Sequence, residues 1–218
     1  MASRLGELFE DAVLKEKIKK KLPFLFNIAE LESSRAGKVG MEVGSLRERI
    51  LIALLIYKFR EANVEKELPI TSPELDIRLF GSPVSIKTIT GVSGVKVIWT
   101  VDAKKAREFY ENYEPSCDVL LAQIKWEMQQ TEIARGKHPG GLFLIPVEVQ
   151  QRVLQELGKD NYLKLPKVGT NPRGVEISKE GVVRWLTDKE TKSLPIVWTR
   201  VSITYDPYKR WVDYWKDD

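Results

Sequence analysis

Asp76 and Lys87 are the two residues whose types and spacing most directly suggest chemistry. They lie in PELDIRLF and PVSIKTIT, whose alternating apolar residues predict two β-strands joined at Gly-Ser-Pro. A carboxylate can hold a divalent cation, and an amine on the next strand can orient or deprotonate a water beside a phosphodiester. On a solvated face the same pair would be a cross-strand salt bridge worth less than about 1 kcal/mol.

The turn between these strands determines how the two residues face each other. A two-residue loop at Gly81-Ser82, with glycine first as a type II′ turn allows, pairs Phe80 with Pro83. In that register Asp76 lies directly opposite Lys87, with Cβ atoms about 5 Å apart. The other face of the hairpin then carries only apolar side chains and is predicted to be a core surface: Leu75, Ile77, Leu79, Val84 and Ile86.

A second carboxylate can come from the helix predicted for SLRERILIALLIYKFREAN, residues 45–63, which is apolar on nearly all sides. Glu48 lies at the mouth of its buried stripe, where it could complete a metal site. Ser45 and Glu48 also have the spacing of a capping box, which would only stabilise the helix start. Both interpretations stay open. Glu42 and Asp102 are alternative carboxylates, although Asp102 has the position of an N-cap.

The order of the remaining elements predicts how these groups are held. Alternating helices and strands without a linker rich in Gly, Pro or Ser predict one α/β domain, with a mixed β-sheet flanked by helices. Helices are expected at 3–22, 103–113 and 147–157. Strands are expected at 74–80, 84–90, about 95–100, 119–126 and 142–146. Short strands are expected in the C-terminal third, among them VVRWL and PIVWTRVSIT.

Composition limits the class of protein. The chain has 218 residues, 43% hydrophobic and 30% charged, which predicts a folded soluble domain with a substantial core. No apolar window is long enough for a membrane span, and the N-terminus does not resemble a signal peptide, so we expect a cytoplasmic protein. One cysteine (Cys117) and one histidine (His138) exclude disulfide and zinc frameworks and speak against a histidine triad. The net charge of +4 permits nucleic-acid binding without requiring it.

Pro73-Glu74-Leu75-Asp76 followed by Ser85-Ile86-Lys87 resembles the PD-(D/E)xK signature of restriction-type nucleases. Ser85 departs from that signature, which usually has Asp or Glu at this position. Some members keep a serine there and take the missing carboxylate from a neighbouring helix. The resemblance implies Asp76, Lys87, Glu48 and Ser85 as catalytic residues, and a Mg²⁺ site that involves Asp76, Glu48 and Ile86.

Two Gly- and Pro-containing stretches are candidates for DNA contacts. In ESSRAGKVGMEVG, Arg35 and Lys38 suit phosphates, and Met41 either packs at the helix entry or acts as a wedge between base steps. In VGTNPRGVEIS, three side chains could read base edges in the major groove, or the segment is an ordinary loop with an Asx-turn. These three residues are Thr170, Asn171 and Arg173.

Together, ESSRAGKVGMEVGSLRE, PITSPELDI…SIKTIT and Trp99-Thr100-Val101-Asp102 resemble the ThaI-type restriction endonucleases. In that family a symmetric dimer cuts the palindrome CGCG to blunt ends, and a methionine from each subunit intercalates from the minor groove. Met41 matches that methionine. The resemblance therefore implies a type II restriction endonuclease with the restriction-endonuclease-like fold, acting as a homodimer on double-stranded DNA.

The implied organisation is a single nuclease domain over residues 1–218. It would comprise an N-terminal helical region (1–30), a catalytic core (31–150) and a C-terminal DNA-contacting region (151–218). Two alternatives stay open: a repair or junction-cleaving nuclease of the same superfamily, and a non-catalytic DNA-binding protein in which Ser85 marks a decayed site.

Overall fold

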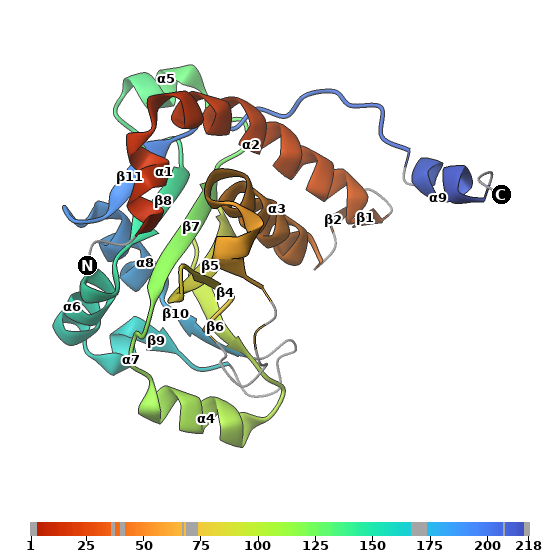
Figure 1. Cartoon of the computed structure of the whole chain (residues 1–218). Coiled ribbons are helices and arrows are strands. Elements are labelled where there is room, and N and C mark those ends of the chain that lie inside the picture. The colour runs from red at the N-terminus through yellow and green to blue at the C-terminus, as the bar shows by residue number, and fades with distance from the viewer. Residues whose placement is uncertain are drawn as a thin grey trace.

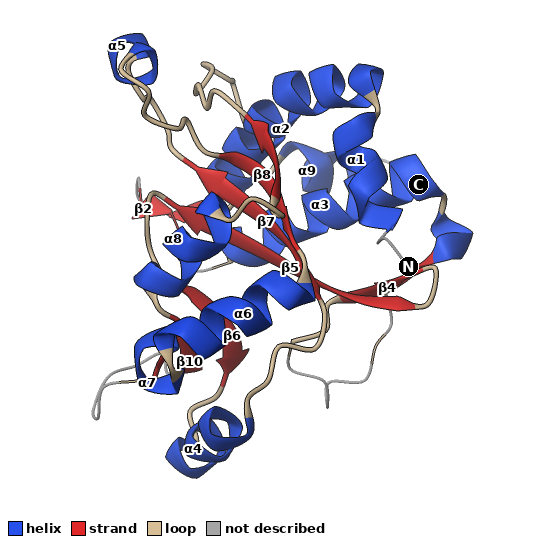
Figure 2. Cartoon of the chain, turned by 90° about the vertical axis from the view of Figure 1, so that its left-hand side faces the viewer, coloured by secondary structure: helices blue, strands red, loops and turns tan. Residues whose placement is uncertain are grey.

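The computed structural model describes residues 4–35, 38–39, 42–66, 68, 74–166, 174–206 and 208–215. In this part of the chain a six-stranded mixed sheet passes through the middle of the molecule, with helices on both faces (Figure 1 and Figure 2). The strands follow one another across the sheet as β11 (Lys192–Pro195), β8 (Gly141–Ile145), β7 (Asp118–Ile124), β5 (Ser82–Thr90), β4 (Ile77–Leu79) and β3 (Val64–Glu65).

The centre of the sheet is the parallel pair of β5 and β7, whereas the other neighbours are antiparallel. β7 and β8 are buried on both faces, in agreement with their nearly continuous apolar sequences. Parallel neighbours need a crossover connection, so the chain leaves the sheet after β5 and returns to β7 by way of β6 (Val95–Trp99) and α4 (Ala103–Asn112).

Two hydrophobic cores lie on opposite faces of the sheet. The first is covered by α1 (Glu7–Glu10), α2 (Ala12–Glu32) and α3 (Val43–Phe59), and it receives Ile77, Leu79, Val84 and Ile86 of the hairpin. The second is covered by α6 (Val147–Leu157), α7 (Lys159–Tyr162) and α8 (Lys179–Thr187). The predicted apolar face of the β4–β5 hairpin is thus confirmed for these four residues, whereas Leu75 is half-buried and lies outside the first core.

Two smaller sheets lie beside the central one. β10 (Gly174–Ile177) pairs on one side with β6 and on the other with β9 (Leu163–Lys164), and β1 (Ser34–Arg35) pairs with β2 (Lys38–Val39) directly before α3. Four short helices complete the described structure: η1 (Arg4–Gly6), η2 (Glu61–Asn63), α5 (Gln130–Ala134) and α9 (Lys209–Tyr214).

The N-terminal helix differs from the one predicted at 3–22. It breaks at Asp11, whose side chain accepts a hydrogen bond from the Leu14 backbone N–H and caps α2. α2 then continues through Pro23 to Glu32, because buried side chains on both sides of the proline keep the helix packed against the first core. The missing proline N–H weakens one turn without ending the helix.

The C-terminal third contains the clearest error of the prediction. VVRWL is not a strand but part of α8, which begins after the N-cap Ser178, whose hydroxyl accepts a hydrogen bond from the Gly181 N–H. Val182 and Trp185 are both buried, and this spacing of three is helical. In PIVWTRVSIT, only Pro195 belongs to a strand, β11, and Trp198 forms an isolated bridge with Trp126.

The predicted α/β class, with a mixed sheet flanked by helices, is confirmed. The helices predicted at 103–113 and 147–157 and the strands predicted at 119–126 and 142–146 are present with ends that differ by a few residues. None of the helices in the described ranges combines the length and apolar character that a membrane crossing needs.

Candidate active site

The β4–β5 hairpin turns one residue earlier than the sequence predicts. Its two-residue loop is Phe80-Gly81, and both residues have positive φ angles, 49° and 79°. Two successive positive φ angles are typical of a type I′ turn, whose twist matches that of the flanking strands. The predicted pairing of Phe80 with Pro83 is therefore wrong, and Leu79 pairs with Ser82.

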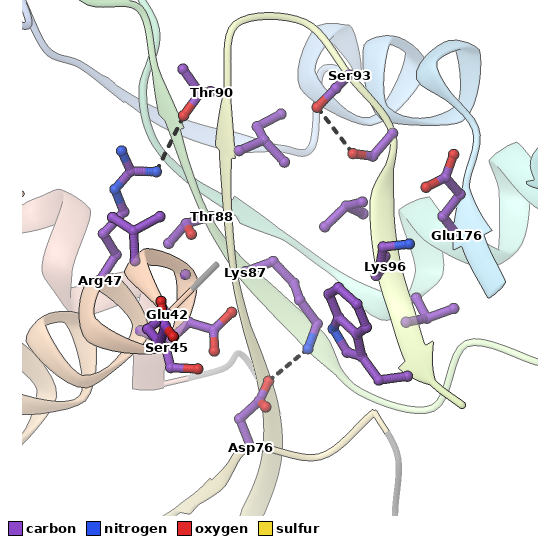
Figure 3. Close-up of a pocket in the computed structure, with 18 residues that line it drawn as sticks. Glu42, Ser45, Arg47, Asp76, Lys87, Thr88, Thr90, Ser93, Lys96 and Glu176 are labelled. Atoms are coloured by element: carbon purple, nitrogen blue, oxygen red, sulfur yellow. Dashed lines mark hydrogen bonds and ion pairs between the residues drawn. The ribbon is translucent and has the colours of Figure 1, made fainter. Parts of the chain in front are cut away.

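This register, continued to Asp76 just before β4, places Ser85 rather than Lys87 opposite the aspartate. The predicted opposed pair is therefore wrong by two positions. Because side chains alternate between faces, such a shift leaves all three side chains on the same face. Lys87 reaches Asp76 diagonally, with its Nζ 3.0 Å from Asp76 Oδ2 (Figure 3).

The carboxylate of Asp76 is held by three donors that all bind the same oxygen. Asp76 Oδ2 accepts hydrogen bonds from the Ile86 N–H at 2.6 Å, from Lys87 Nζ at 3.0 Å and from Ser85 Oγ at 3.1 Å. No described residue donates to Oδ1. The β5 strand therefore fixes the orientation of the carboxylate and leaves its second oxygen available to a ligand.

Ser85 supports Asp76 rather than replacing a carboxylate. Its side chain is buried, with only 3% of the residue exposed, and its hydroxyl donates to Asp76 Oδ2. A buried acid at this position would lie beside Asp76 and add a like charge. The second carboxylate of the site must therefore come from another element.

Glu48 of α3 lines the same cavity as Asp76 and Lys87. α3 begins at Val43, so Ser45 lies inside its first turn, and the interpretation of Ser45 and Glu48 as a capping box is wrong. Burial raises the pKa of Glu48 to about 7; the ammonium of Lys87 acts against this shift, and the charge of Asp76 adds to it. Glu48 thus lies close to both hairpin residues, and it has no hydrogen bond to a described residue.

One cavity of about 920 Å³ contains all three groups. Its walls are the start of α3, the last four residues of β5, the strand β6 and Glu176 of β10. Figure 3 shows Asp76 and Lys87 between the end of α3 that carries Ser45 and the strand that carries Lys96. Two carboxylates and one lysine therefore face a space that can hold more than a single small ion.

Lys96, Trp99 and Glu176 also line this cavity, and none of them was predicted as a site residue. The alternation in VKVIW offered a signal for one of them, because Val95 and Val97 are buried in the second core and Lys96 points to the other side. Nothing in the sequence indicated that this side of β6 faces the β4–β5 hairpin.

Arg47, next to Glu48 in α3, also lines the cavity but belongs to a closed polar cluster. Its guanidinium forms a short ion pair with the buried Glu30 and donates to Thr90 Oγ1 at 3.2 Å. Glu30 also accepts from Trp126 Nε1 at 2.6 Å and from Arg200 at 2.9 Å. This cluster ties α2, α3 and the segment after β11 together.

The alternative carboxylates fit less well. Asp102 is the N-cap of α4, where it accepts from the N–H groups of Lys104 and Lys105. Glu42 is exposed at the rim of the cavity. Within the described ranges, no group of three or more His, Cys, Asp or Glu residues is arranged to hold a metal. A cation at Asp76 and Glu48 would therefore need further oxygen ligands from the backbone, water or substrate.

The predicted DNA-contacting residues lie mostly outside the described residues. Met41, Thr170, Asn171 and Arg173 are not within them. The backbones of Arg35 and Lys38 pair with each other in the β1–β2 hairpin, which leads directly into α3. Their contacts with DNA stay a prediction.

The mixed sheet carries a hairpin that presents an aspartate and a lysine to one cleft, beside a glutamate from the preceding helix. This arrangement defines a restriction-endonuclease-like protein. The model of the family described as "Restriction endonuclease ThaI" matches residues 8–217, so the chain belongs to this family and is a type II site-specific endonuclease. The predicted family and fold are thereby confirmed.

A solved structure supports the same assignment. The chain is similar to one described as "Restriction endonuclease in complex with substrate DNA", with 55% sequence identity and a TM-score of 0.87. The match covers 99% of this chain and 100% of that chain. Among the curated proteins, none matches the chain.

Proposed function

We propose that the protein is a Mg²⁺-dependent enzyme that hydrolyses phosphodiester bonds in double-stranded DNA at a short palindrome. The observation that carries this proposal is the meeting of Glu48, Asp76 and Lys87 in one cleft. Burial raises the pKa of Glu48 to about 7 although the ammonium of Lys87 lies nearby, so the ionised form of this carboxyl is not fully stabilised by the protein. A divalent cation would stabilise that form.

The donor set suits magnesium. Asp76 and Glu48 offer hard oxygen ligands, and the Ile86 carbonyl leaves β5 on the same edge as the N–H that binds Asp76. Magnesium usually takes only one or two protein carboxylates and completes its shell with water and substrate phosphate. Among the described residues no group of three or more His, Cys, Asp or Glu is arranged to hold a metal, which agrees with this small number of protein ligands.

The residues of the site would share the chemistry as follows. When bound, the cation acts as a Lewis acid on the phosphoryl group. Lys87, held by Asp76, positions the attacking water in line with the leaving oxygen. Its positive charge stabilises the negative charge that develops as the new O–P bond forms and the old one breaks. Ser85 and the Ile86 N–H keep the Asp76 carboxylate in place during this step.

The remaining proposals concern recognition. A palindromic target is naturally read by a two-fold symmetric protein, which favours a homodimer. The family resemblance suggests CGCG as the target, with blunt ends, and Met41 as the residue that enters the minor groove. Arg35 and Lys38 would bind phosphates, and Thr170, Asn171 and Arg173 would contact bases. The DNA in the similar solved structure supports double-stranded DNA as the partner.

We also propose that residues 1–218 act as one nuclease domain with the three regions given above. The first hydrophobic core supports this, because it contains Leu5 and Leu8 from the N-terminal helices together with Ile196 and Trp198. The N-terminal helices and residues 196–198 therefore share one core with the sheet that carries the site.

Digestion of a plasmid of known sequence tests the proposed function. With Mg²⁺ the protein should give discrete fragments, and mapping their ends identifies the target and the position of the cut. Asp76→Ala should bind the same duplex and show no cleavage, because it removes both a cation ligand and the partner of Lys87. Random fragments, or cleavage by Asp76→Ala at the parental rate, would exclude the proposed mechanism.

A further inference from the structure

The strand β6 forms the wall of the cavity that faces the Asp76–Lys87 hairpin. Trp99, at the end of this strand, is 62% exposed and lines the cavity. The ammonium of Lys96 lies 4.6 Å from the centroid of the Trp99 ring, which is the distance of a cation–π contact. A large apolar ring and a cation therefore stand together in a cleft otherwise lined largely by polar groups.

The acidic residue opposite Lys96 does not neutralise it. Lys96 pairs across the sheet with Glu176 of β10, yet no ion pair joins their side chains. Within the described residues Lys96 makes no salt bridge with any carboxylate, and its ammonium rests on the indole of Trp99. Its charge stays available to a ligand in the cavity (Figure 3).

We propose that Lys96 and Trp99 bind the backbone of the DNA strand that is cut. Lys96 contacts a phosphate next to the scissile one, and Trp99 packs against the deoxyribose of the same nucleotide. This inference rests on the proposed cleavage of DNA, and it assigns to β6 a role in positioning the substrate that is separate from the carboxylates and Lys87.

Three features of the cleft support this assignment. A volume of about 920 Å³ exceeds the need of a single phosphate, so the neighbouring nucleotide has room to enter. Lysine is a common phosphate ligand in protein–DNA complexes. In a stacked duplex the faces of the bases are covered, so the sugars are the apolar surface that an indole at the backbone can reach.

The position of β10 connects this wall with the predicted recognition loop. Gly174 pairs with Trp99, and it follows Arg173 directly in the sequence. A Cβ atom at Gly174 would lie 2.2 Å from the Ile98 carbonyl oxygen, so only glycine lets β10 approach β6 here. The described strand β10 therefore begins opposite Trp99.

A second lysine–aromatic pair provides a control. Lys17 of α2 lies 4.7 Å from the ring centroid of Tyr57 of α3 and also donates a hydrogen bond to its hydroxyl, and Tyr57 is also 62% exposed. Neither Lys17 nor Tyr57 lines the cavity that contains Asp76. Variants of this pair remove the same kinds of groups from a surface outside the cleft.

The test for Lys96 is the salt dependence of binding to a duplex that contains the mapped target, with EDTA in place of Mg²⁺. Lys96→Met should lower the slope of log K against log salt by about 0.9 for each bound subunit, and so by about 1.8 for the proposed homodimer, which loses two phosphate contacts. Lys96→Arg should keep the parental slope, and so should Lys17→Met. An unchanged slope for Lys96→Met, or an equal loss for Lys17→Met, would overturn the proposal.

Trp99 should give a different signature. Trp99→Ala is expected to weaken binding by about tenfold without changing the salt slope, because it removes apolar contact and no charge. In cleavage with Mg²⁺ it should raise KM and leave kcat nearly unchanged. Tyr57→Ala should alter neither. A fall in kcat with unchanged affinity would mean that Trp99 acts on the catalytic groups and not on the DNA backbone.

A neutral methylphosphonate at the phosphate beside the cut identifies the contact. It should weaken binding by the parent protein and have no further effect on Lys96→Met. If instead its effects on the two proteins are equal, Lys96 does not bind this phosphate. Failure of the unaltered protein to bind or cut DNA would remove the proposed function itself, which separates that outcome from the failure of the Lys96 proposal.

Discussion

Arg47 and Glu48 are successive residues of α3, and each belongs to a different cluster of buried charged groups. The two clusters differ in their ratio of carboxylates to positively charged groups. In the first, the single carboxylate of Glu30 is surrounded by Arg47, Arg200 and the Trp126 N–H. In the second, the two carboxylates of Glu48 and Asp76 share the one ammonium of Lys87. Both clusters border the same cavity.

The difference indicates which cluster maintains the fold and which one binds. A buried carboxylate with two guanidinium groups and an indole N–H has its charge and its hydrogen bonds satisfied within the protein. In the Asp76 cluster, burial raises the pKa of Glu48 to about 7; the ammonium of Lys87 opposes this shift, and the charge of Asp76 adds to it. Such an arrangement is stabilised by a cation that comes from outside the chain.

The largest expected effect is on Lys87. Lys87→Met should reduce the rate of DNA cleavage by about 10² to 10⁴-fold, because it removes the positioned cation beside the reacting phosphate. Its free energy of unfolding should change by less than about 1 kcal/mol, since Ile86 and Ser85 still hold Asp76. Single-turnover cleavage and urea denaturation measure the two quantities. A variant that cuts at the parental rate would remove Lys87 from the mechanism.

Arg47→Met should show the reverse pattern. It leaves the buried Glu30 with fewer partners, so the free energy of unfolding should fall by about 3 kcal/mol, as is typical when one member of a buried ion pair is removed. Urea denaturation gives this value, and the m-value should stay unchanged. A loss below about 1 kcal/mol would show that the Glu30 cluster does not maintain the fold and would end the contrast with the Asp76 cluster.

The smallest of these effects concerns Glu48. Glu48→Gln keeps the shape of the side chain and removes its charge, so half-maximal cleavage should require at least about tenfold more Mg²⁺. Without Mg²⁺ the variant should be as stable as the parent or more so at neutral pH, because a buried negative charge is gone. Titration of cleavage with Mg²⁺ and thermal melting in EDTA test both statements. An unchanged Mg²⁺ requirement would show that Glu48 is not a ligand.

Local patterns were enough to predict the acid–lysine pair, even though one step of the reasoning was wrong. The turn lies at Phe80-Gly81 because Phe80 takes a positive φ, which general rules assign to glycine or asparagine. Its ring contacts Phe59 and lies under Arg4, contacts that no local rule contains. The resulting shift by two left Asp76 and Lys87 on one face, so the error did not reach the site.

In the C-terminal third, by contrast, local patterns predicted the wrong type of element. The β-branched residues of VVRWL favour a strand, but the cap at Ser178 and the burial of Val182 and Trp185 at helical spacing determine α8. Here the local preference is weak, and the packing of α8 against α6 and α7 decides the structure.

The sequence by itself determined which residues share a face of the hairpin, which helix carries Glu48 and which family the chain resembles. These properties follow from the backbone geometry of each element, since a strand repeats every two residues and a helix about every 3.6. Only the tertiary structure decided that Glu48 lies near Asp76, that Arg47 pairs with Glu30, and that Lys96 and Trp99 line the same cavity as the hairpin. Contacts between segments far apart in the chain depend on how the two cores pack against the sheet, and no local period contains that information.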